Sequence, residues 1–293
     1  MTKKTKLKLG LPKGSLQDST VRIFKKAGFS INVTGRSYFP FIDDENVEAV
    51  MFRAQEMSRY VEDGIIDCGI TGNDWVMENA SKVVRVSDLV YAKQTNRPVR
   101  WVLAVPEKSK IRSIKSLRNK KIATELVNVT KTYLKKKKIK ADVEFSWGTT
   151  EAKTKMGIDA IVELTETGTS LRANELRIIA TICESTTQFI ANKKAWKDKW
   201  KRKKIEEIIL LLKGAILAED KVGLKMNVRE KDLKRVLKLL PAMKKPTISC
   251  LSEKDWYDVD TIISESIARI LIPKLKDAGA QGIIEYPLNK VIY

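Results

Sequence analysis

The sequence of 293 residues contains no histidine. Histidine is the usual general base near neutral pH and the commonest metal ligand, so its absence narrows the available chemistry. Hydrolases that depend on a serine–histidine or cysteine–histidine pair are excluded. Any catalysis by this chain must therefore use carboxylates, lysines, hydroxyls, backbone amides or a metal ion held by oxygen atoms.

Cysteine is also scarce. The chain has only Cys68, Cys183 and Cys250, an odd number of residues that lie far apart in the sequence. Neither the spacing of a zinc site nor the framework of a disulfide-rich domain is present. Because each cysteine stands in an apolar run typical of a strand, we expect three buried, reduced thiols.

Long hydrophobic runs are absent too. No apolar segment approaches the ~20 residues that a membrane helix requires. The N-terminal stretch MTKKTKLKLGLPKGS is basic, but it lacks the apolar core of a signal peptide. These absences predict a soluble, cytoplasmic protein that makes no membrane contact.

Positive charge, by contrast, is abundant: 56 lysines and arginines against 36 acidic residues leave a formal net charge of +20. Such a charge favours polyanionic partners, which include nucleic acids, membrane surfaces and phosphate-rich small molecules. Lysines cluster at 135–138 and 193–204, where a solvated helix face is the simpler interpretation. No zinc-finger spacing, RNP-like motif or glycine-rich basic tail accompanies them, so we expect phosphorylated small molecules and no nucleic acid.

Hydrophobic periodicity predicts strands that alternate with helices along the N-terminal two-thirds of the chain, an α/β fold with a parallel or mixed sheet in two lobes. The predicted strands are 6–14, 47–53, 65–72, 97–106, 120–125, 141–148, 158–164, 177–183 and 188–192. The predicted helices are 15–27, a segment ending at 58–64, 128–138, 150–157 and about 195–220. Ser15 is a plausible N-cap of the first helix, and Gly28 is placed to end it.

The C-terminal part follows a different order. A strand at 221–228 and a helix at 229–240 precede two strands, a second helix and a last strand, at 246–251, 256–263, 264–279 and 282–287. This β-α-β-β-α-β order is that of a ferredoxin-like unit. We therefore predict lobe I at 1–98, completed by about 185–213, lobe II at 99–184, and a separate C-terminal domain at 214–293.

Four predicted strands run into loops rich in glycine, hydroxyl groups and charge. These loops are LPKGS (11–15), ITGND (70–74), WGTTE (147–151) and TETGTSL (165–171). In α/β sheets ligands bind beyond the carboxyl ends of the strands. Glycine lets the backbone approach a ligand, and hydroxyls with successive amides can surround a phosphate. The loops therefore predict a site for a phosphorylated ligand.

Several motifs carry a resemblance to a known family. They are GLPKGSL (10–16), DCGITGNDW (67–75), IATE (122–125), NVTKTYL (128–134), GTTEA (148–152) and DAIVELTETGTSLRANEL (159–176). In this order they resemble the ATP phosphoribosyltransferase family. The C-terminal stretches PTIS (246–249) and GAQGIIEYPLNKVI (279–292) resemble the regulatory, histidine-binding domain of the family's long form.

The resemblance implies the first step of histidine biosynthesis. N1 of the adenine of ATP attacks C1 of phosphoribosyl pyrophosphate and displaces pyrophosphate, with Mg²⁺ held mostly by substrate phosphates and no protein ligand assigned. The nucleophile belongs to the substrate, so the protein only has to orient two polyanions and stabilise the leaving group. A catalytic body like a two-lobed periplasmic binding protein, inhibition by histidine and a homo-oligomer (dimer or hexamer) are implied as well.

The resemblance also assigns residues. The loop that ends in the motif TGTSL should cup the 5-phosphate, and Glu163, which stands where the family usually has aspartate, should meet the ribose hydroxyls. The residues assigned to phosphoribosyl pyrophosphate are Glu163, Thr167, Gly168, Thr169, Ser170 and Leu171. Those assigned to ATP are Lys13, Gly14, Ser15, Gly72, Asp74 and Glu125. Those assigned to catalysis are Lys13, Arg53, Glu151 and Glu163.

Two other functions stay open at this point. The first is a two-lobed solute-binding protein without catalysis, which measured turnover would exclude. The second is a basic nucleic-acid-binding regulator that senses a ligand through its C-terminal domain, which would show DNA affinity with a steep salt dependence.

Overall fold

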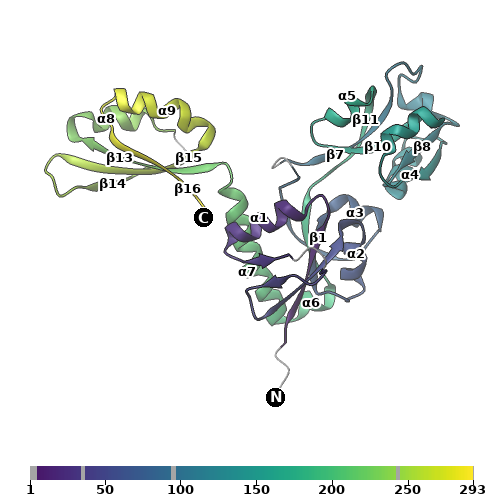
Figure 1. Cartoon of the computed structure of the whole chain (residues 1–293), viewed down its shortest axis with the longest axis horizontal. Coiled ribbons are helices and arrows are strands. Elements are labelled where there is room, and N and C mark those ends of the chain that lie inside the picture. Colours follow the sequence, from purple (N-terminus) through teal and green to yellow (C-terminus); the bar gives the residue numbers. More distant parts are fainter. Residues whose placement is uncertain (1–4, 34–36, 94–96, 242–244, 293) are drawn as a thin grey trace. The chain divides into compact units, whose positions relative to one another are not determined.

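The computed structural model describes residues 5–33, 37–93, 97–241 and 245–292. The chain divides into two compact units, Met1–Ile209 and Leu210–Tyr293. The first unit contains two five-stranded sheets, and the second unit contains one four-stranded sheet (Figure 1). Within the described ranges no helix has the length and apolar character needed to cross a membrane. The lobe boundaries predicted from the sequence stay predictions.

The first sheet of the N-terminal unit has the strand order β4-β1-β5-β12-β6. Its strands are β1 (Leu7–Lys13), β4 (Val47–Arg53), β5 (Cys68–Gly72), β6 (Val84–Leu89) and β12 (Thr187–Ala191). β1 is parallel to β4 and β5, whereas β12 is antiparallel to β5 and β6, so the sheet is mixed. All residues of β5 and β12 are buried, which explains the nearly continuous apolar sequence that leads into β5.

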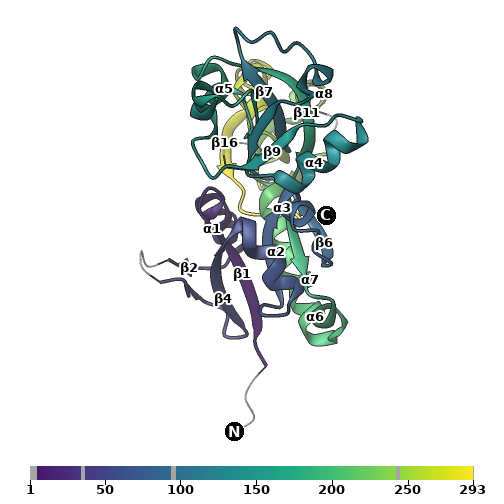
Figure 2. The same cartoon turned by 90° about the vertical axis from the view of Figure 1, so that its right-hand side faces the viewer.

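Helix α1 (Gln17–Ala27) follows the carboxyl end of β1 (Figure 2). Gly28 ends it with a φ of 98°, a left-handed conformation that glycine adopts without strain, as predicted. The predicted N-cap at Ser15 is wrong. Gly14 makes a tight turn in which its carbonyl accepts a bond from Gln17 N–H, so Leu16 takes the N-cap position.

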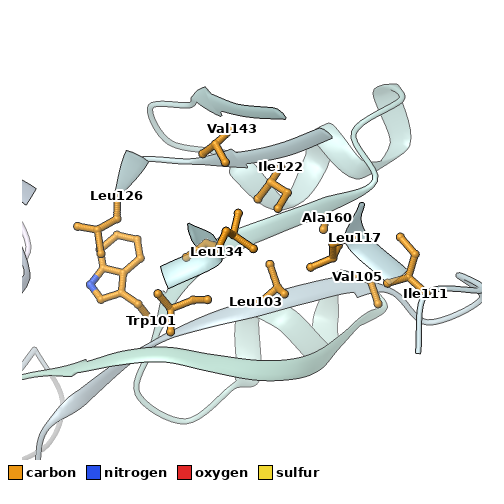
Figure 3. Close-up of a cluster of buried hydrophobic side chains, with 12 residues drawn as sticks. Trp101, Leu103, Val105, Ile111, Leu117, Ile122, Leu126, Leu134, Val143 and Ala160 are labelled. Atoms are coloured by element: carbon orange, nitrogen blue, oxygen red, sulfur yellow. The ribbon is translucent and has the colours of Figure 1, made fainter. Parts of the chain in front are cut away.

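The second sheet of the N-terminal unit has the order β11-β7-β10-β8-β9. Its strands are β7 (Val99–Pro106), β8 (Lys121–Thr124), β9 (Asp142–Phe145), β10 (Ala160–Thr165) and β11 (Leu176–Ser185). Alternate residues of β7 enter two different cores, because successive side chains of a strand point to opposite faces. Trp101 and Leu103 pack with Leu134 of helix α4 (Val127–Lys136) (Figure 3), whereas Val102 packs with Leu171 of helix α5 (Thr169–Ala173).

Short elements are the main omission from the sequence prediction. It did not include the hairpin β2 (Ile31–Asn32) and β3 (Phe41–Ile42), strand β6, helix α3 (Asn73–Glu78), helix α5 or the 3-10 turn η1 (Ile114–Leu117). The helix expected at 150–157 is a 3-10 helix, η2 (Thr150–Met156). These segments are too short, or in β6 too polar, to show a clear hydrophobic period.

The remaining helices of the N-terminal unit are α2 (Ala54–Glu62) and α6 (Lys193–Lys197), and α7 (Lys199–Leu217) crosses the division between the units. The expectation of three buried thiols is only partly correct. Cys68 is buried and Cys183 is half-buried. Cys250 is exposed, as are the other three residues of its strand, which lies at the edge of its sheet.

The C-terminal unit consists of β13 (Lys221–Arg229), α8 (Glu230–Leu239), β14 (Thr247–Cys250), β15 (Trp256–Ser264), α9 (Glu265–Asp277) and β16 (Gln281–Pro287). Its sheet has the order β14-β15-β13-β16, and every neighbouring pair is antiparallel. Val222, Leu224 and Met226 alternate along β13 and pack with Leu271 and Leu275 of α9. This confirms the predicted ferredoxin-like unit.

Candidate active site

A cavity of about 270 Å³ in the N-terminal unit collects residues from both of its sheets. The assigned residues that line it are Lys13, Ser15, Arg53, Gly72, Asp74, Glu125 and Glu163. The assigned residues that do not line it are Gly14, Glu151 and the whole loop 167–171. A larger cavity of about 530 Å³ also includes Lys13 and Arg53, but none of the other assigned residues. The smaller cavity is therefore the better candidate.

Two cations stand at the carboxyl ends of neighbouring parallel strands. Lys13 of β1 is paired in register with Arg53 of β4. Gly14 has a φ of 106°, and a Cβ atom there would lie 3.1 Å from Arg53 Nη1, so the guanidinium packs directly against this turn. The Lys13 Nζ atom lies 3.9 Å from the ring centroid of Tyr38. This edge of the sheet can attract an anion such as a pyrophosphate or triphosphate.

Asp74 is a buried carboxylate, only 3% exposed, at the start of α3. Its Oδ2 atom accepts a hydrogen bond of 2.6 Å from Trp101 Nε1, and its Oδ1 accepts one from the Trp75 amide. The Asp74 amide in turn donates to Ser185 Oγ. Burial raises the pKa of the Asp74 carboxyl, and these donors oppose that effect. No pattern in the sequence indicated Trp101 or Ser185 as its partners.

The position two residues before this acid, Gly72, must be glycine for a steric reason. A Cβ atom at Gly72 would collide with Asp74 Oδ1. The motif TGND therefore combines a buried acid with the only residue type that leaves room for its carboxylate in this conformation.

Three carboxylates lie near one another at the ends of β8 and β10 and in η2. Burial, followed by the negative charge of Glu151, raises the pKa of Glu163 to about 7, and the charge of Glu125 contributes further. The Leu164 amide donates to Glu163 Oε1 over 3.1 Å. Glu125 accepts bonds from the Gly148 amide and from Gln55 Nε2, at 3.3 and 3.5 Å. The protonated form of Glu163 is thus accessible near neutral pH, and the side chain can accept or donate a hydrogen bond.

The loop 165–171 connects β10 to α5. Gly168 has a φ of 76°, and its amide donates to Thr165 Oγ1 over 2.7 Å. The hydroxyls of Thr167 and Thr169 are 2.9 Å apart. The side chain of Leu171 is buried in the core, so only its backbone amide can serve a ligand. The left-handed glycine turns the chain so that hydroxyls and the first amides of α5 gather at one surface.

Arg172 is a residue of this loop region that the sequence analysis did not single out. Its Nη1 donates to the Thr167 carbonyl over 3.1 Å, and its Nη2 donates to Thr169 Oγ1 over 3.3 Å. Arg172 follows Thr169 by three residues, a spacing that puts both side chains on the same face of a helical turn. This spacing is the signal in the sequence that could have identified Arg172. Arg172 adds a fixed positive charge to the loop.

Metal ligands are few. In the described part of the chain no three histidine, cysteine or acidic side chains converge on one point. A divalent cation at this site would therefore need most of its oxygen ligands from a bound substrate or from water, which is the usual situation for Mg²⁺ with phosphates.

Comparison with known proteins supports the resemblance found in the sequence. The family model described as ATP phosphoribosyltransferase matches residues 53–214, and that of the HisG C-terminal domain matches residues 218–290. The ATP phosphoribosyltransferase of Thermodesulfovibrio yellowstonii is 60% identical over 286 residues, which cover 98% of both chains.

Two solved structures are also similar. The ATP phosphoribosyl transferase (HisG:HisZ) complex from Thermotoga maritima contains a chain that is 27% identical, with a TM-score of 0.60, over 70% of this chain and 98% of that one. The periplasmic aliphatic sulphonate binding protein SsuA from Escherichia coli is 16% identical, with a TM-score of 0.43, over 72% of this chain and 74% of that one. With both family models matched and a close relative covered end to end, the chain belongs to the ATP phosphoribosyltransferase family.

Proposed function

We propose that the cavity between the two sheets of the N-terminal unit transfers the phosphoribosyl group of phosphoribosyl pyrophosphate to N1 of the adenine of ATP. This is the first step of histidine biosynthesis. The observation that carries the proposal is the 60% identity to an ATP phosphoribosyltransferase over 98% of both chains. The bond from C1 of the ribose to the pyrophosphate oxygen breaks as the bond to N1 forms, and pyrophosphate leaves.

The loop 167–171 is the proposed site of the 5-phosphate. Its support is the cluster of hydroxyls on Thr167, Thr169 and Ser170, the turn at Gly168, and the charge of Arg172. Hydroxyls, backbone amides and a guanidinium are the groups that bind phosphate oxygens in proteins. Leu171 contributes its amide only.

Lys13 and Arg53 are the proposed partners of the pyrophosphate and triphosphate groups, with Gly14 and Ser15 providing backbone and hydroxyl contacts. The support is their common position at the ends of β1 and β4. Fixed cations that face a leaving group stabilise the charge that develops on it, and this is commonly a large term in catalysis.

The carboxylates have separate proposed roles. Glu163 holds the ribose hydroxyls, and its pKa of about 7 lets it accept or donate a hydrogen bond there. Glu151 is the acid near the reacting centre, and Glu125, Gly72 and Asp74 border the adenosine part of ATP. Because Asp74 is engaged by Trp101, Trp75 and Ser185, we assign it to shaping the wall of the cavity.

Mg²⁺ is the proposed cofactor, carried mainly by the substrate phosphates, whose charge it neutralises. Glu163, Glu151 and Glu125 are the acidic side chains of this chain that could supply one further oxygen ligand, directly or through water. The chain's own cations, Lys13 and Arg53, act on the remaining phosphate charge.

The C-terminal unit is the proposed regulatory domain, which binds histidine and lowers activity. The support is the match of residues 218–290 to the C-terminal domain model of the family. The proposal also includes a homo-oligomer, either a dimer or a hexamer, and a cytoplasmic location. The location agrees with the three unpaired cysteines, which suit a reducing compartment.

The test is an ultraviolet assay with ATP, phosphoribosyl pyrophosphate and Mg²⁺, with pyrophosphatase present to pull the reaction forward. An absorbance rise from N1-substituted adenine, suppressed by histidine, is the expected result. A rise that histidine does not change would remove the regulatory role and leave the enzyme. No rise, although both substrates bind, would favour a two-lobed binding protein without catalysis.

A further inference from the structure

In the unliganded chain, the hydroxyl of Ser170 in the proposed phosphate loop already has a negatively charged partner. Ser170 Oγ donates to Glu151 Oε1 over 2.5 Å, a length typical of a hydroxyl bonded to a carboxylate. Ser170 is exposed and Glu151 is half-buried, so a ligand can reach this bond from the solvent. The two residues belong to different segments, α5 and η2.

The other polar groups of the loop are held by contacts within the loop. The Gly168 amide is bonded to Thr165, the hydroxyls of Thr167 and Thr169 are bonded to each other, and Arg172 bridges both threonines. The loop is thus shaped in advance by its own residues. The carboxylate on Ser170 is a contact of another kind, because it comes from outside and carries charge.

Carboxylate and phosphate compete at this position for two reasons. A serine hydroxyl has one proton to donate, so it cannot bond to Glu151 and to a phosphate oxygen at the same time. In addition, a phosphate in the loop would stand next to the charge of Glu151. The negative charge of Glu151 acts on other groups of the site, because it is among the causes that raise the pKa of Glu163.

We propose that Glu151 is an internal stand-in for the 5-phosphate, held by Ser170 while the loop is empty and displaced when the phosphate enters. Binding of the phosphate and release of Glu151 are then a single event. Ser170 is the positioning residue that keeps this acid on the loop until the substrate arrives. The inference rests on the proposed function, because it takes the loop as the site of the 5-phosphate.

The test is calorimetric titration of the full chain with ribose 5-phosphate, which carries the phosphate but has no pyrophosphate to transfer. Glu151→Gln keeps the shape of the side chain and removes its charge. We expect it to bind ribose 5-phosphate about tenfold more tightly, because a competing charge-assisted hydrogen bond is lost. The exposed Glu144→Gln in β9, the strand that precedes η2, also removes one negative charge and should leave the affinity unchanged.

The second arm repeats the comparison in the Ser170→Ala background. With no hydroxyl to hold the acid, Glu151→Gln should change the affinity by less than about twofold. Weaker or unchanged binding in Glu151→Gln alone would overturn the proposal. An equal gain in both backgrounds would also overturn it, since that result means a general charge effect without competition for Ser170. Matching circular dichroism spectra and thermal midpoints show that all variants are folded.

The transferase assay on the unaltered chain separates this inference from the proposed function. Product formation without any gain of affinity in Glu151→Gln would overturn the inference and keep the enzyme. A gain that depends on Ser170, in a chain that forms no product, would support the inference and reject the transferase.

Discussion

The indole Nε1 of Trp101 donates a hydrogen bond of 2.6 Å to Oδ2 of Asp74. Trp101 belongs to β7 in the second sheet, and Asp74 follows β5 of the first sheet. The carboxylate lies in the wall of the candidate cavity, and its donors there include the indole and the Trp75 amide. This buried hydrogen bond therefore joins residues that come from the two sheets of the N-terminal unit.

Trp101→Phe should therefore destabilise the N-terminal unit. The substitution keeps an aromatic ring but leaves a buried carboxylate short of one donor, which costs roughly 1–3 kcal/mol. The measurement is the midpoint of thermal unfolding of the full chain. Trp75→Phe is the matched control, because the Trp75 indole N–H has no hydrogen-bond partner among the residues described. Equal losses in the two variants would mean that ring packing, and not the bond to Asp74, causes the effect.

Gly168→Asp should abolish binding of phosphoribosyl pyrophosphate, with an affinity loss of at least about a hundredfold. The new side chain would start 3.0 Å from Arg172 Nη1 and would place negative charge where the phosphate is proposed to bind. Gly157→Asp is the control, since Gly157 also has a positive φ, of 94°, but a Cβ atom there meets nothing within 4 Å. Calorimetry of both variants checks the prediction. If Gly157→Asp binds as poorly as Gly168→Asp, backbone strain and not the phosphate site explains the loss.

The raised pKa of Glu163 predicts that the free energy of unfolding of the N-terminal unit depends on pH. The pKa of Glu163 in the folded chain is raised to about 7 from an ordinary value of 4.5, so the folded state favours the protonated form. The stability that this preference contributes is fully present below pH 4.5 and is lost as the pH rises through about 7. Glu163→Gln removes the dependence and should stabilise the unit above pH 8 by on the order of 3 kcal/mol, but not near pH 4.

Thermal midpoints of the Glu163→Gln variant and the parent chain between pH 4 and pH 9 check this sign. The exposed Glu144→Gln serves as the control for loss of a charge from the same sheet. A difference between Glu163→Gln and the parent that shrinks as the pH rises would contradict a raised pKa.

Removal of the C-terminal unit should abolish inhibition by histidine while transferase activity is retained. The unit has a hydrophobic core of its own, formed by the strands β13 and β15 with the helices α8 and α9. A chain that ends at Leu217 keeps helix α7 whole. The expected result in the ultraviolet assay is turnover with at least a tenfold rise in the histidine concentration needed for half inhibition. A truncated chain that stays active and equally sensitive to histidine would show that the regulator binds elsewhere.

Much of the fold could be predicted because its strands have strong local signals. The alternation in 47–53 reproduces β4 residue for residue, and the strand predicted at 97–106 differs from β7 by two residues. The ferredoxin-like order followed from six elements of normal length. Two local predictions failed: Ser15 as a cap, and the burial of Cys250, which depends on the neighbours of β14 and not on its own apolar sequence. The helix expected at 150–157 is present, but as the 3-10 helix η2.

The candidate site divides in the same way. The residue types of the loops 11–15, 70–74 and 165–171 are visible in the sequence, and their common place at strand ends follows from the rules of α/β sheets. The partners of these residues are not visible. Asp74 and Trp101 are separated by 27 positions, and Ser170 and Glu151 by 19, so no local pattern links them.

The sequence by itself thus determined the secondary-structure elements, the family and the chemical character of the loops, because these depend on residue type and on spacing within one segment. Only the tertiary structure decided that β12 inserts between β5 and β6, that Asp74 is buried against Trp101, and that the pKa of Glu163 rises to about 7. Burial, proximity of charges and hydrogen-bond partners arise between distant segments. They are fixed only when the chain has folded.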